Sequence, residues 1–257
     1  MEIIIKNNYS EISSESAIII ANQIKAKPDS VLGLATGSTP IGLYEELVRL
    51  HLNEGLDFSN VISFNLDEYV GLPKEHEQSY KMFMQNKLFS KINIKEENIH
   101  IPDGSLPICD KCEKYESSIN SFGGIDLQIL GIGSDGHIAF NEPSSSLGSR
   151  TRVKTLTQET IKDNSIFFND IANVPKFAIT MGVGTIMEAK EILLLASGKS
   201  KAIPIKKAIE GPITSMCSAS AIQMHPKTIV ILDEDAAKDL NEQDYYKWVH
   251  RNKVKFN

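Results

Sequence analysis

Three side chains that can hold or move protons stand close together in the glycine-rich stretch 131–143, namely Asp135, His137 and Glu142. A carboxylate beside a histidine fixes the tautomer of the imidazole and favours its charged form, so the set suits general acid–base catalysis. The neighbouring glycines let the backbone approach a ligand closely. The residue types alone also fit a structural turn. They fit two ligands of a metal site as well, but no nearby second histidine or cysteine completes one. No metal is therefore predicted.

A second candidate site is the stretch 33–42, where an apolar run passes through glycine and hydroxyl residues toward a proline. Ser38 or Thr39 is predicted to cap a helix whose first position is Pro40. Free backbone N–H groups at such a terminus, with nearby hydroxyls, can bind an anion. No lysine follows at the spacing of a Walker P-loop. The pattern fits a capped helix with nothing bound equally well. The candidate phosphate-binding residues here are Thr36, Gly37, Ser38 and Thr39.

Two further patterns carry weaker signals by themselves. Asp67 and Glu68 form an acidic pair at the end of an apolar run, which is often only a solvated corner. Cys109 and Cys112 form a CxxC pair with no second pair to complete a zinc site, and we interpret them as incidental thiols on a helix. Three cysteines in all make a disulfide framework improbable on number alone.

Alternating segments of two periodicities must position these residues. Short β-rich apolar runs occur at 3–5, 31–35, 61–66, 127–132, 177–181, 191–196 and 228–232. Segments with helical periodicity occur at 13–25, 41–52, 79–89, 111–120, 199–210 and 235–249. This alternation predicts an α/β fold with a mainly parallel, doubly wound sheet and helices on both faces. Ligands of such sheets bind beyond the carboxyl ends of the strands, where the stretches described above begin.

Length and composition set the broad class. A chain of 257 residues predicts a single α/β domain spanning 1–257. A net charge of −6 argues against a nucleic-acid partner, and an anionic substrate would need local cations. No apolar run is long enough to cross a membrane, and the start of the chain lacks a signal-peptide pattern. We therefore expect a cytoplasmic protein.

Three long motifs resemble those of the glucosamine-6-phosphate deaminase (isomerising) family. They are Gly-x-Gly-x-Asp-Gly-His-Ile-Ala-Phe-Asn-Glu-Pro at 131–143, Thr-Gly-Ser-Thr-Pro at 36–40 and Asp-Glu-Tyr-Val-Gly-Leu-Pro at 67–73. The resemblance extends over about residues 1–233. It implies conversion of glucosamine 6-phosphate and water to fructose 6-phosphate and ammonium in amino-sugar catabolism, without a cofactor or a metal.

The resemblance also implies roles for single residues. Asp67 matches the base that acts on the C2 proton of the sugar. His137 matches the residue that shuttles the proton of ring opening, with Asp135 and Glu142 holding and polarising it. The stretch Thr36–Thr39 matches the phosphate loop, and Lys201 matches a phosphate-binding lysine that would otherwise pass for surface charge.

Regulation is a further implication of the resemblance. Ser145, Arg152 and Lys154 match positions at which regulated members bind N-acetylglucosamine 6-phosphate, in a site shared between subunits. Activation by this effector should therefore accompany a homo-hexamer, whereas a monomer would lack it. From the residues alone, this basic and hydroxyl-rich stretch fits a solvated connection.

The segment 158–173 resembles the active-site lid of the family but departs from it at one position. Many members have Asn-Ser-Arg-Phe-Phe where this chain has Ile166 in place of the arginine. Loss of that cation predicts weaker binding of the substrate phosphate. Two rival functions remain at this level: a related sugar-phosphate enzyme such as a 6-phosphogluconolactonase or an isomerase, and a sugar-phosphate-sensing module without catalysis. The retained acid–base residues favour the enzyme.

Overall fold

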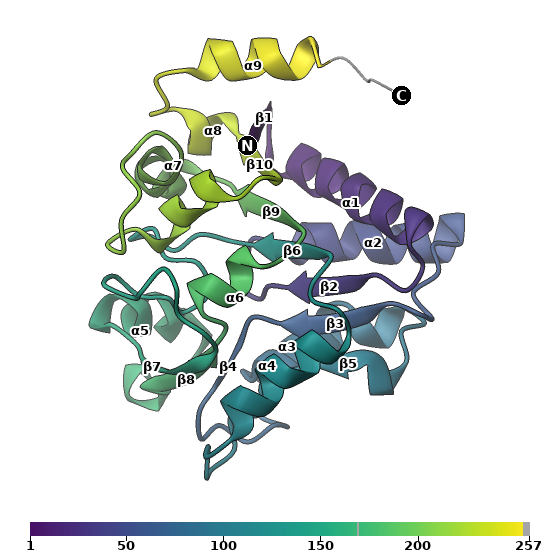
Figure 1. The fold of residues 1–257 in the computed structure, drawn as a ribbon, viewed down its shortest axis with the longest axis vertical. Coiled ribbons are helices and arrows are strands. Elements are labelled where there is room, and N and C mark those ends of the chain that lie inside the picture. Colours follow the sequence, from purple (N-terminus) through teal and green to yellow (C-terminus); the bar gives the residue numbers. More distant parts are fainter. Residues whose placement is uncertain (169, 254–257) are drawn as a thin grey trace.

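The computed structural model describes residues 1–168 and 170–253, so Asn169 of the expected lid and residues 254–257 lie outside the described residues. Its centre is a parallel sheet with the strand order β1-β10-β9-β6-β2-β3-β5 (Figure 1). The strands are β1 (Glu2–Lys6), β2 (Val31–Leu34), β3 (Ile62–Asn65), β5 (Ile99–His100), β6 (Leu127–Leu130), β9 (Glu191–Ala196) and β10 (Thr228–Asp233).

Helices cover both faces of this sheet, with α4 in front of it and α2 behind it in the view of Figure 1. The predicted α/β class with a mainly parallel sheet is therefore confirmed. The helices are α1 (Tyr9–Ala26), α2 (Ile41–Glu54), α3 (Tyr80–Lys87), α4 (Lys111–Ser121), α5 (Gln158–Asn164), α6 (Val183–Met187), α7 (Ala202–Ile209), α8 (Glu234–Ala237) and α9 (Gln243–Arg251). Among the described residues, none of them is long and apolar enough to cross a membrane.

A second, smaller sheet was not expected. It consists of β4 (Asp67–Tyr69), β8 (Phe177–Thr180) and β7 (Arg152–Thr155), paired antiparallel in the order β4-β8-β7. The run 177–181 was predicted as a strand and is one, but it belongs to this small sheet. Strands as short as three or four residues give too little alternation to be recognised in a sequence.

The predicted helix 235–249 is wrong, because the chain turns between α8 and α9. The backbone N–H groups of Asn241 and Glu242 donate to the carboxylate of Glu210 at 2.9–3.0 Å, which satisfies the turn from another part of the chain. The CxxC pair is also only half on a helix. Cys112 lies in α4, whereas Cys109 lies in the turn before it with a φ of 33°.

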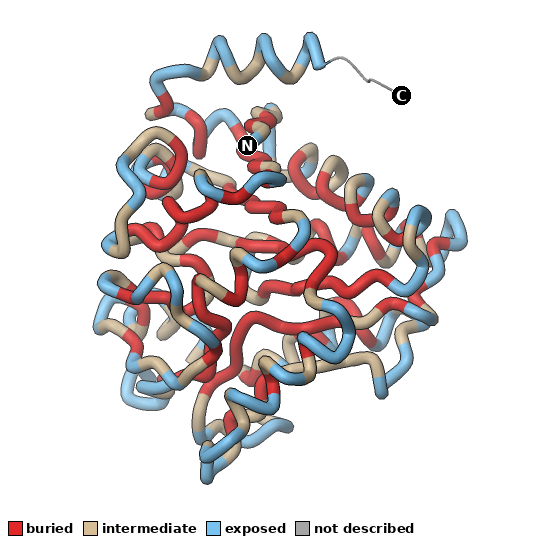
Figure 2. The backbone as a smooth tube through the Cα atoms, viewed as in Figure 1, coloured by how far each residue is buried: buried red, intermediate tan, exposed pale blue. Residues whose placement is uncertain are grey.

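The core is continuous through the central strands, as the buried segments in Figure 2 show. All four residues of β2 and all four of β6 are buried. Burial on both faces is what a parallel sheet covered by helices requires. The strands β9, β6, β2 and β3 are successive neighbours, so their carboxyl ends meet at one edge of the sheet. That edge receives the loops at 131–143 and 36–40, the loop before Lys201, and the chain leading to Asp67.

Candidate active site

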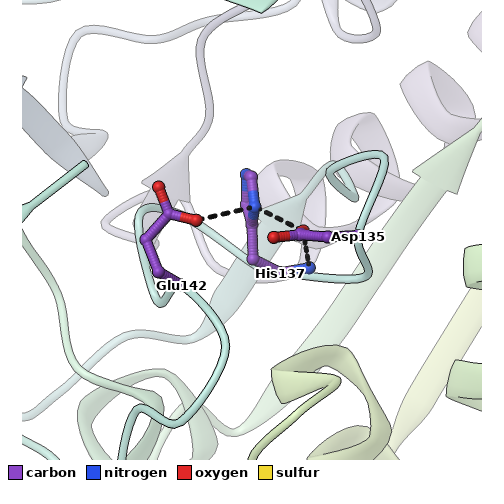
Figure 3. Close-up of side chains that lie close together, drawn as sticks. All are labelled: Asp135, His137 and Glu142. Carbon is purple, nitrogen blue, oxygen red and sulfur yellow. Dashed lines mark hydrogen bonds and ion pairs between the residues drawn. The ribbon is translucent and has the colours of Figure 1, made fainter. Parts of the chain in front are cut away.

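The three proton-carrying residues of the loop after β6 lie in contact with one another (Figure 3). The Nδ1 atom of His137 is 2.7 Å from Oδ1 of Asp135 and 3.6 Å from Oε2 of Glu142. Asp135 Oδ1 also accepts a hydrogen bond of 3.0 Å from the backbone N–H of His137. Glu142 is buried, whereas the other two are partly exposed. The imidazole is thus held between two acids and remains accessible from solvent.

Electrostatics support a charged Asp135. Burial raises the pKa of its carboxyl group, but the hydrogen bond and the positive charge of His137 outweigh burial, so the net pKa lies below the usual value. Possible ligand atoms of the three side chains lie within 4.8 Å of one another, so the group could also surround a cation. A tetrahedral metal with bonds of about 2.1 Å would separate two ligands by about 3.4 Å. The observed 2.7 Å between Nδ1 of His137 and Oδ1 of Asp135 is shorter than that and is the separation of a direct ion pair.

Two glycines shape the loop around His137. A Cβ atom at Gly133 would lie 2.3 Å from Cε1 of the His137 ring, so any larger residue would displace the imidazole. Gly136 has a φ of 95°, and a Cβ atom there would lie 2.6 Å from Sγ of Cys217. Glycine is required at both positions, for space at the first and for space and backbone conformation at the second.

Ser218 and Asn141 stabilise the same loop through hydrogen bonds, and sequence reasoning missed both. Ser218 Oγ accepts from the backbone N–H of Ile138 at 3.2 Å and donates to the carbonyl of Asn141 at 2.8 Å. The amide of Asn141 donates to the carbonyls of Ile138 at 3.0 Å and Met181 at 2.9 Å. These bonds fix the spacing of His137 and Glu142. The signal that could have found Asn141 is its place inside the motif, whereas Ser218 is 77 and 80 residues away from the two loop residues that it contacts.

Asp67 lies in β4 of the small sheet, next to the edge of the main sheet at which the loops described above begin. It is buried, with 6% of its surface exposed, and no side chain or backbone group of the described residues donates a hydrogen bond to its carboxylate. Burial raises the pKa of Asp67 to about 8, and the charge of Glu68 adds to the effect. Glu68 points elsewhere and accepts from the N–H groups of Tyr80 and Lys81 at the start of α3, at 3.1 and 3.0 Å. Asp67 is therefore free to accept a proton.

The predicted cap of α2 is wrong: Pro40 occupies the N-cap position, and no side chain of the 36–40 loop caps the helix. The hydroxyl of Tyr9 replaces the cap. It accepts from the N–H of Gly42 at 2.8 Å and donates toward the carbonyls of Ser38 and Thr39 at 3.2 and 3.0 Å. The hydroxyls of the loop are consequently not consumed by capping. Gly37, with a φ of 90°, has open space where a side chain would be.

Lys201 and the 36–40 loop approach the same point. Lys201 lies in a short 3-10 helix (Lys199–Lys201) after β9, and its Nζ donates to the carbonyl of Ile132 at 2.8 Å. A Cβ atom on the adjacent Gly131 would lie 3.9 Å from Oγ1 of Thr39. Burial lowers the pKa of Lys201, and the charges of Asp163 and Asp135 partly oppose that shift. The ammonium group of Lys201 and the hydroxyl of Thr39 thus both lie near the start of the loop at 131–143.

Thr157, the residue directly before the expected lid (158–173), contacts Glu142. The backbone N–H of Thr157 donates to Oε1 of Glu142 at 3.1 Å, and its Oγ1 lies 3.4 Å from Oε2. Thr157 also caps α5 by accepting from the N–H of Thr160. Ile166 follows in a 3-10 helix (Ser165–Phe167), and 79% of its surface is exposed.

The three residues matched to a regulatory site have different environments. Ser145 is buried, and its hydroxyl has no hydrogen-bond partner among the described residues. Arg152 and Lys154 lie two residues apart on β7 and so point to the same face of the small sheet. Nη1 of Arg152 donates to Oδ1 of Asn141 at 2.9 Å. The guanidinium group therefore contacts the loop that carries His137 and Glu142.

Comparison with known proteins places the chain in a family. Residues 8–231 match the family model described as glucosamine-6-phosphate isomerases/6-phosphogluconolactonase. A glucosamine-6-phosphate deaminase of Thermoanaerobacter pseudethanolicus is 51% identical over 245 residues, which cover 95% of this chain and 97% of the relative. One from Shewanella loihica is 51% identical over 251 residues, covering 97% and 93% of the two chains.

A solved structure agrees with these relatives. The chain resembles a monomeric glucosamine-6-phosphate deaminase with a TM-score of 0.91 and 45% identity, over 93% of this chain and 100% of that one. The residues matched by the family model include the loops at 131–143 and 36–40 and all three strands of the small sheet. This chain is a member of the family of glucosamine-6-phosphate isomerases and 6-phosphogluconolactonases.

Proposed function

We propose that this protein converts glucosamine 6-phosphate and water to fructose 6-phosphate and ammonium. The observation that carries the proposal is that the sheet edge which receives the Asp135–His137–Glu142 group also receives a buried Asp67 with a raised pKa, in a chain about half identical to proteins named as deaminases. No observation favours lactone hydrolysis or a sensor without catalysis. The test is release of ammonium and formation of fructose 6-phosphate by the purified protein, with 6-phosphogluconolactone hydrolysis measured in parallel.

Ring opening is assigned to the histidine group. Opening the pyranose removes a proton from the C1 hydroxyl and adds one to the ring oxygen, and one imidazole can perform both transfers. Asp135, at 2.7 Å, supports the charged imidazole that forms between them. The products of this step are an aldehyde at C1 and a hydroxyl at C5.

Isomerisation and deamination are assigned to Asp67. The new aldehyde acidifies the C2 proton, which the carboxylate removes to give an enolamine. Return of the proton to C1 gives an imine at C2, and water hydrolyses it to the ketone with loss of ammonium. A buried carboxylate with a raised pKa is a stronger base than a solvated one, so the environment of Asp67 suits this step.

Phosphate binding is assigned to Thr36, Gly37, Ser38, Thr39 and Lys201. Open space at Gly37 and the approach of Thr39 to the catalytic loop support the assignment. Lys201 supplies the local cation that a chain of net charge −6 needs for an anionic substrate.

Replacement of Ile166 by arginine should lower the Michaelis constant for glucosamine 6-phosphate about tenfold or more, with a smaller change in kcat, because a charge-assisted contact contributes about 1.5–3 kcal/mol. Ile166 is exposed, so the substitution removes no core contact. Steady-state kinetics of the two proteins provide the measurement, and Ile166→Gln controls for chain length without charge. An unchanged or higher Michaelis constant would contradict the expected role of position 166.

Regulation and assembly are proposed to go together. The contact of Arg152 with Asn141 supports a link between the candidate effector residues Ser145, Arg152 and Lys154 and the catalytic loop. We expect N-acetylglucosamine 6-phosphate to activate the enzyme if it forms a hexamer. We expect no effect if it is a monomer, as the 45% identical deaminase is described to be. Solution mass and initial rates with and without the effector test this coupling. Activation of a monomer would contradict it.

A cytoplasmic location is also part of the proposal and stays a prediction.

A further inference from the structure

The lid helix α5 is attached to the catalytic loop at both of its ends. At its start, Thr157 donates to Glu142. At its last turn, Oδ2 of Asp163 accepts a hydrogen bond of 2.8 Å from Oγ of Ser134. Ser134 directly precedes Asp135, so the second attachment lies next to the proton-transfer group. Neither Asp163 nor Ser134 stands out in the sequence, because both are exposed polar residues in loops or short helices.

Aromatic contacts hold the end of the lid on the small sheet. The ring of Phe168 packs edge-on against Tyr69, with ring centroids 5.9 Å apart, and lies nearly parallel to His76 at 6.2 Å. Asp163 is consequently held between two fixed points, the Thr157 attachment and the Phe168 contact. Its side chain cannot leave Ser134 by a large movement of the helix without breaking one of them.

The carboxylate of Asp163 also acts on Lys201. Asp163 is bonded to Ser134 and Lys201 to the carbonyl of Ile132, so the two charged groups lie at neighbouring positions of the same loop. The negative charge of Asp163 accordingly opposes the fall in the pKa of Lys201 that burial causes. They do not form an ion pair, because no nitrogen–oxygen distance of 4 Å or less joins them among the described residues. Lys201 is instead bonded to the carbonyl of Ile132, two residues before Ser134. The lid thus brings an acid to the place where the proposed function puts the phosphate of the substrate.

We propose that Asp163 sets the affinity of this site for phosphate: it attaches the lid to the catalytic loop through Ser134 and places a negative charge beside Lys201 that the phosphate must overcome. The proposal rests on the proposed function in assigning Lys201 to the phosphate. Together with Ile166 in place of the family arginine, it describes a lid that opposes the anion it covers. The site should therefore release phosphorylated product readily and require a high substrate concentration.

Two substitutions separate the charge of Asp163 from its hydrogen bond. Asp163→Asn removes the charge and keeps an oxygen that accepts from Ser134. Ser134→Ala removes the bond and keeps the charge. Glu159→Gln is the matched control, because it removes one charge from the same helix at an exposed position with no contact to the catalytic loop. Lys201→Met shows whether the phosphate measured is the one bound at this site.

Binding of inorganic phosphate to each protein is measured by calorimetry at low salt. The dissociation constant should fall about two- to tenfold in Asp163→Asn, the scale expected for removing a partly screened charge near a dianion, and the gain should shrink at high salt. Ser134→Ala should show no such gain, but its lid amides at 158–168 should exchange hydrogen faster. Glu159→Gln should match the wild type, and Lys201→Met should lose most of the binding.

Unchanged or weaker phosphate binding in Asp163→Asn would overturn the proposal, as would phosphate binding that does not depend on Lys201. A gain of equal size in Glu159→Gln would also overturn it, because the effect would then belong to the net charge of the lid. These measurements do not involve turnover. Failure to release ammonium would therefore count against the proposed function alone, and a null result with Asp163→Asn in an active deaminase would count against this inference alone.

Discussion

Replacement of Asp67 by asparagine should lower kcat by about two to four orders of magnitude, the scale on which a general base contributes. The amide has nearly the same size but cannot accept the C2 proton. Substrate binding should change little, because phosphate is assigned to Lys201 and the 36–40 loop. Ammonium release at saturating substrate gives kcat, and the Michaelis constant reports binding. Near-normal turnover would remove Asp67 from the role of base.

The pH dependence tests the same role independently. The pKa of Asp67 is raised to about 8, so the base is largely protonated at neutral pH and kcat/KM should climb as pH rises toward 8. The amine of the substrate titrates in the same range for every variant. The difference between the wild-type profile and that of Asp67→Asn therefore isolates the carboxyl group. Identical profiles for the two proteins would contradict the assignment.

As pH rises toward 8, the stability of the folded protein should fall while its activity increases. Between the ordinary value of 3.8 and about 8, the unfolded chain has released the Asp67 proton while the folded chain retains it. The wild type therefore loses stability as pH rises through this window, and Asp67→Asn should lose less. Glu68→Gln provides the contrast, because Glu68 accepts from N–H groups at the start of α3. That variant should lose stability more than turnover. Chemical denaturation at several pH values measures the stability of the two variants.

Replacement of His137 by glutamine should abolish most turnover of the cyclic substrate, also by about two to four orders of magnitude. Glutamine can form hydrogen bonds in the same place but cannot carry a proton between the C1 hydroxyl and the ring oxygen. Later steps depend on Asp67 and should continue. An analogue that lacks the 5-hydroxyl cannot close to the pyranose, so the variant should lose much less activity on it than on glucosamine 6-phosphate.

The ratio of the two losses is the decisive quantity for His137. Equal losses on the cyclic substrate and on the analogue would place His137 in a later step. No loss on either would make it structural. His76→Gln is a suitable control, because it removes an imidazole that stacks on the lid without touching Asp135 or Glu142. It should retain most activity on both substrates.

The parts of the site that the sequence predicted are those carried by one loop or by parallel topology. Asp135, His137 and Glu142 are near one another along the chain, so a single turn brings them together. Lys201 and the 36–40 loop are distant in sequence. Both still lie at the same edge of the sheet, because each follows a strand whose carboxyl end is at that edge. Local patterns and the rule for parallel sheets suffice for such residues.

The remaining parts depend on partners that no local pattern reveals. Tyr9 caps α2 from 33 residues away, so the hydroxyls of the 36–40 loop gave a misleading cap signal. Ser218 supports the catalytic loop from 80 residues away, and Ser134 meets Asp163 across 29. The small sheet is built from three strands too short to show alternation. Each of these contacts is set by tertiary packing, which overrides the local preference of a segment.

The division of the site between two sheets has a consequence for how the chain folds into an active enzyme. Asp67 is paired with Thr180 and, through β8, aligned with Arg152, while His137 stands on a loop of the main sheet. The pairing of β4 with β8 joins segments more than a hundred residues apart, and such a contact forms late because closing a long loop is costly in entropy. A refolding chain should therefore recover its helices and central strands before it recovers turnover. Recovery of enzymatic activity should therefore report the docking of the small sheet on the main sheet, which recovery of helix content alone does not.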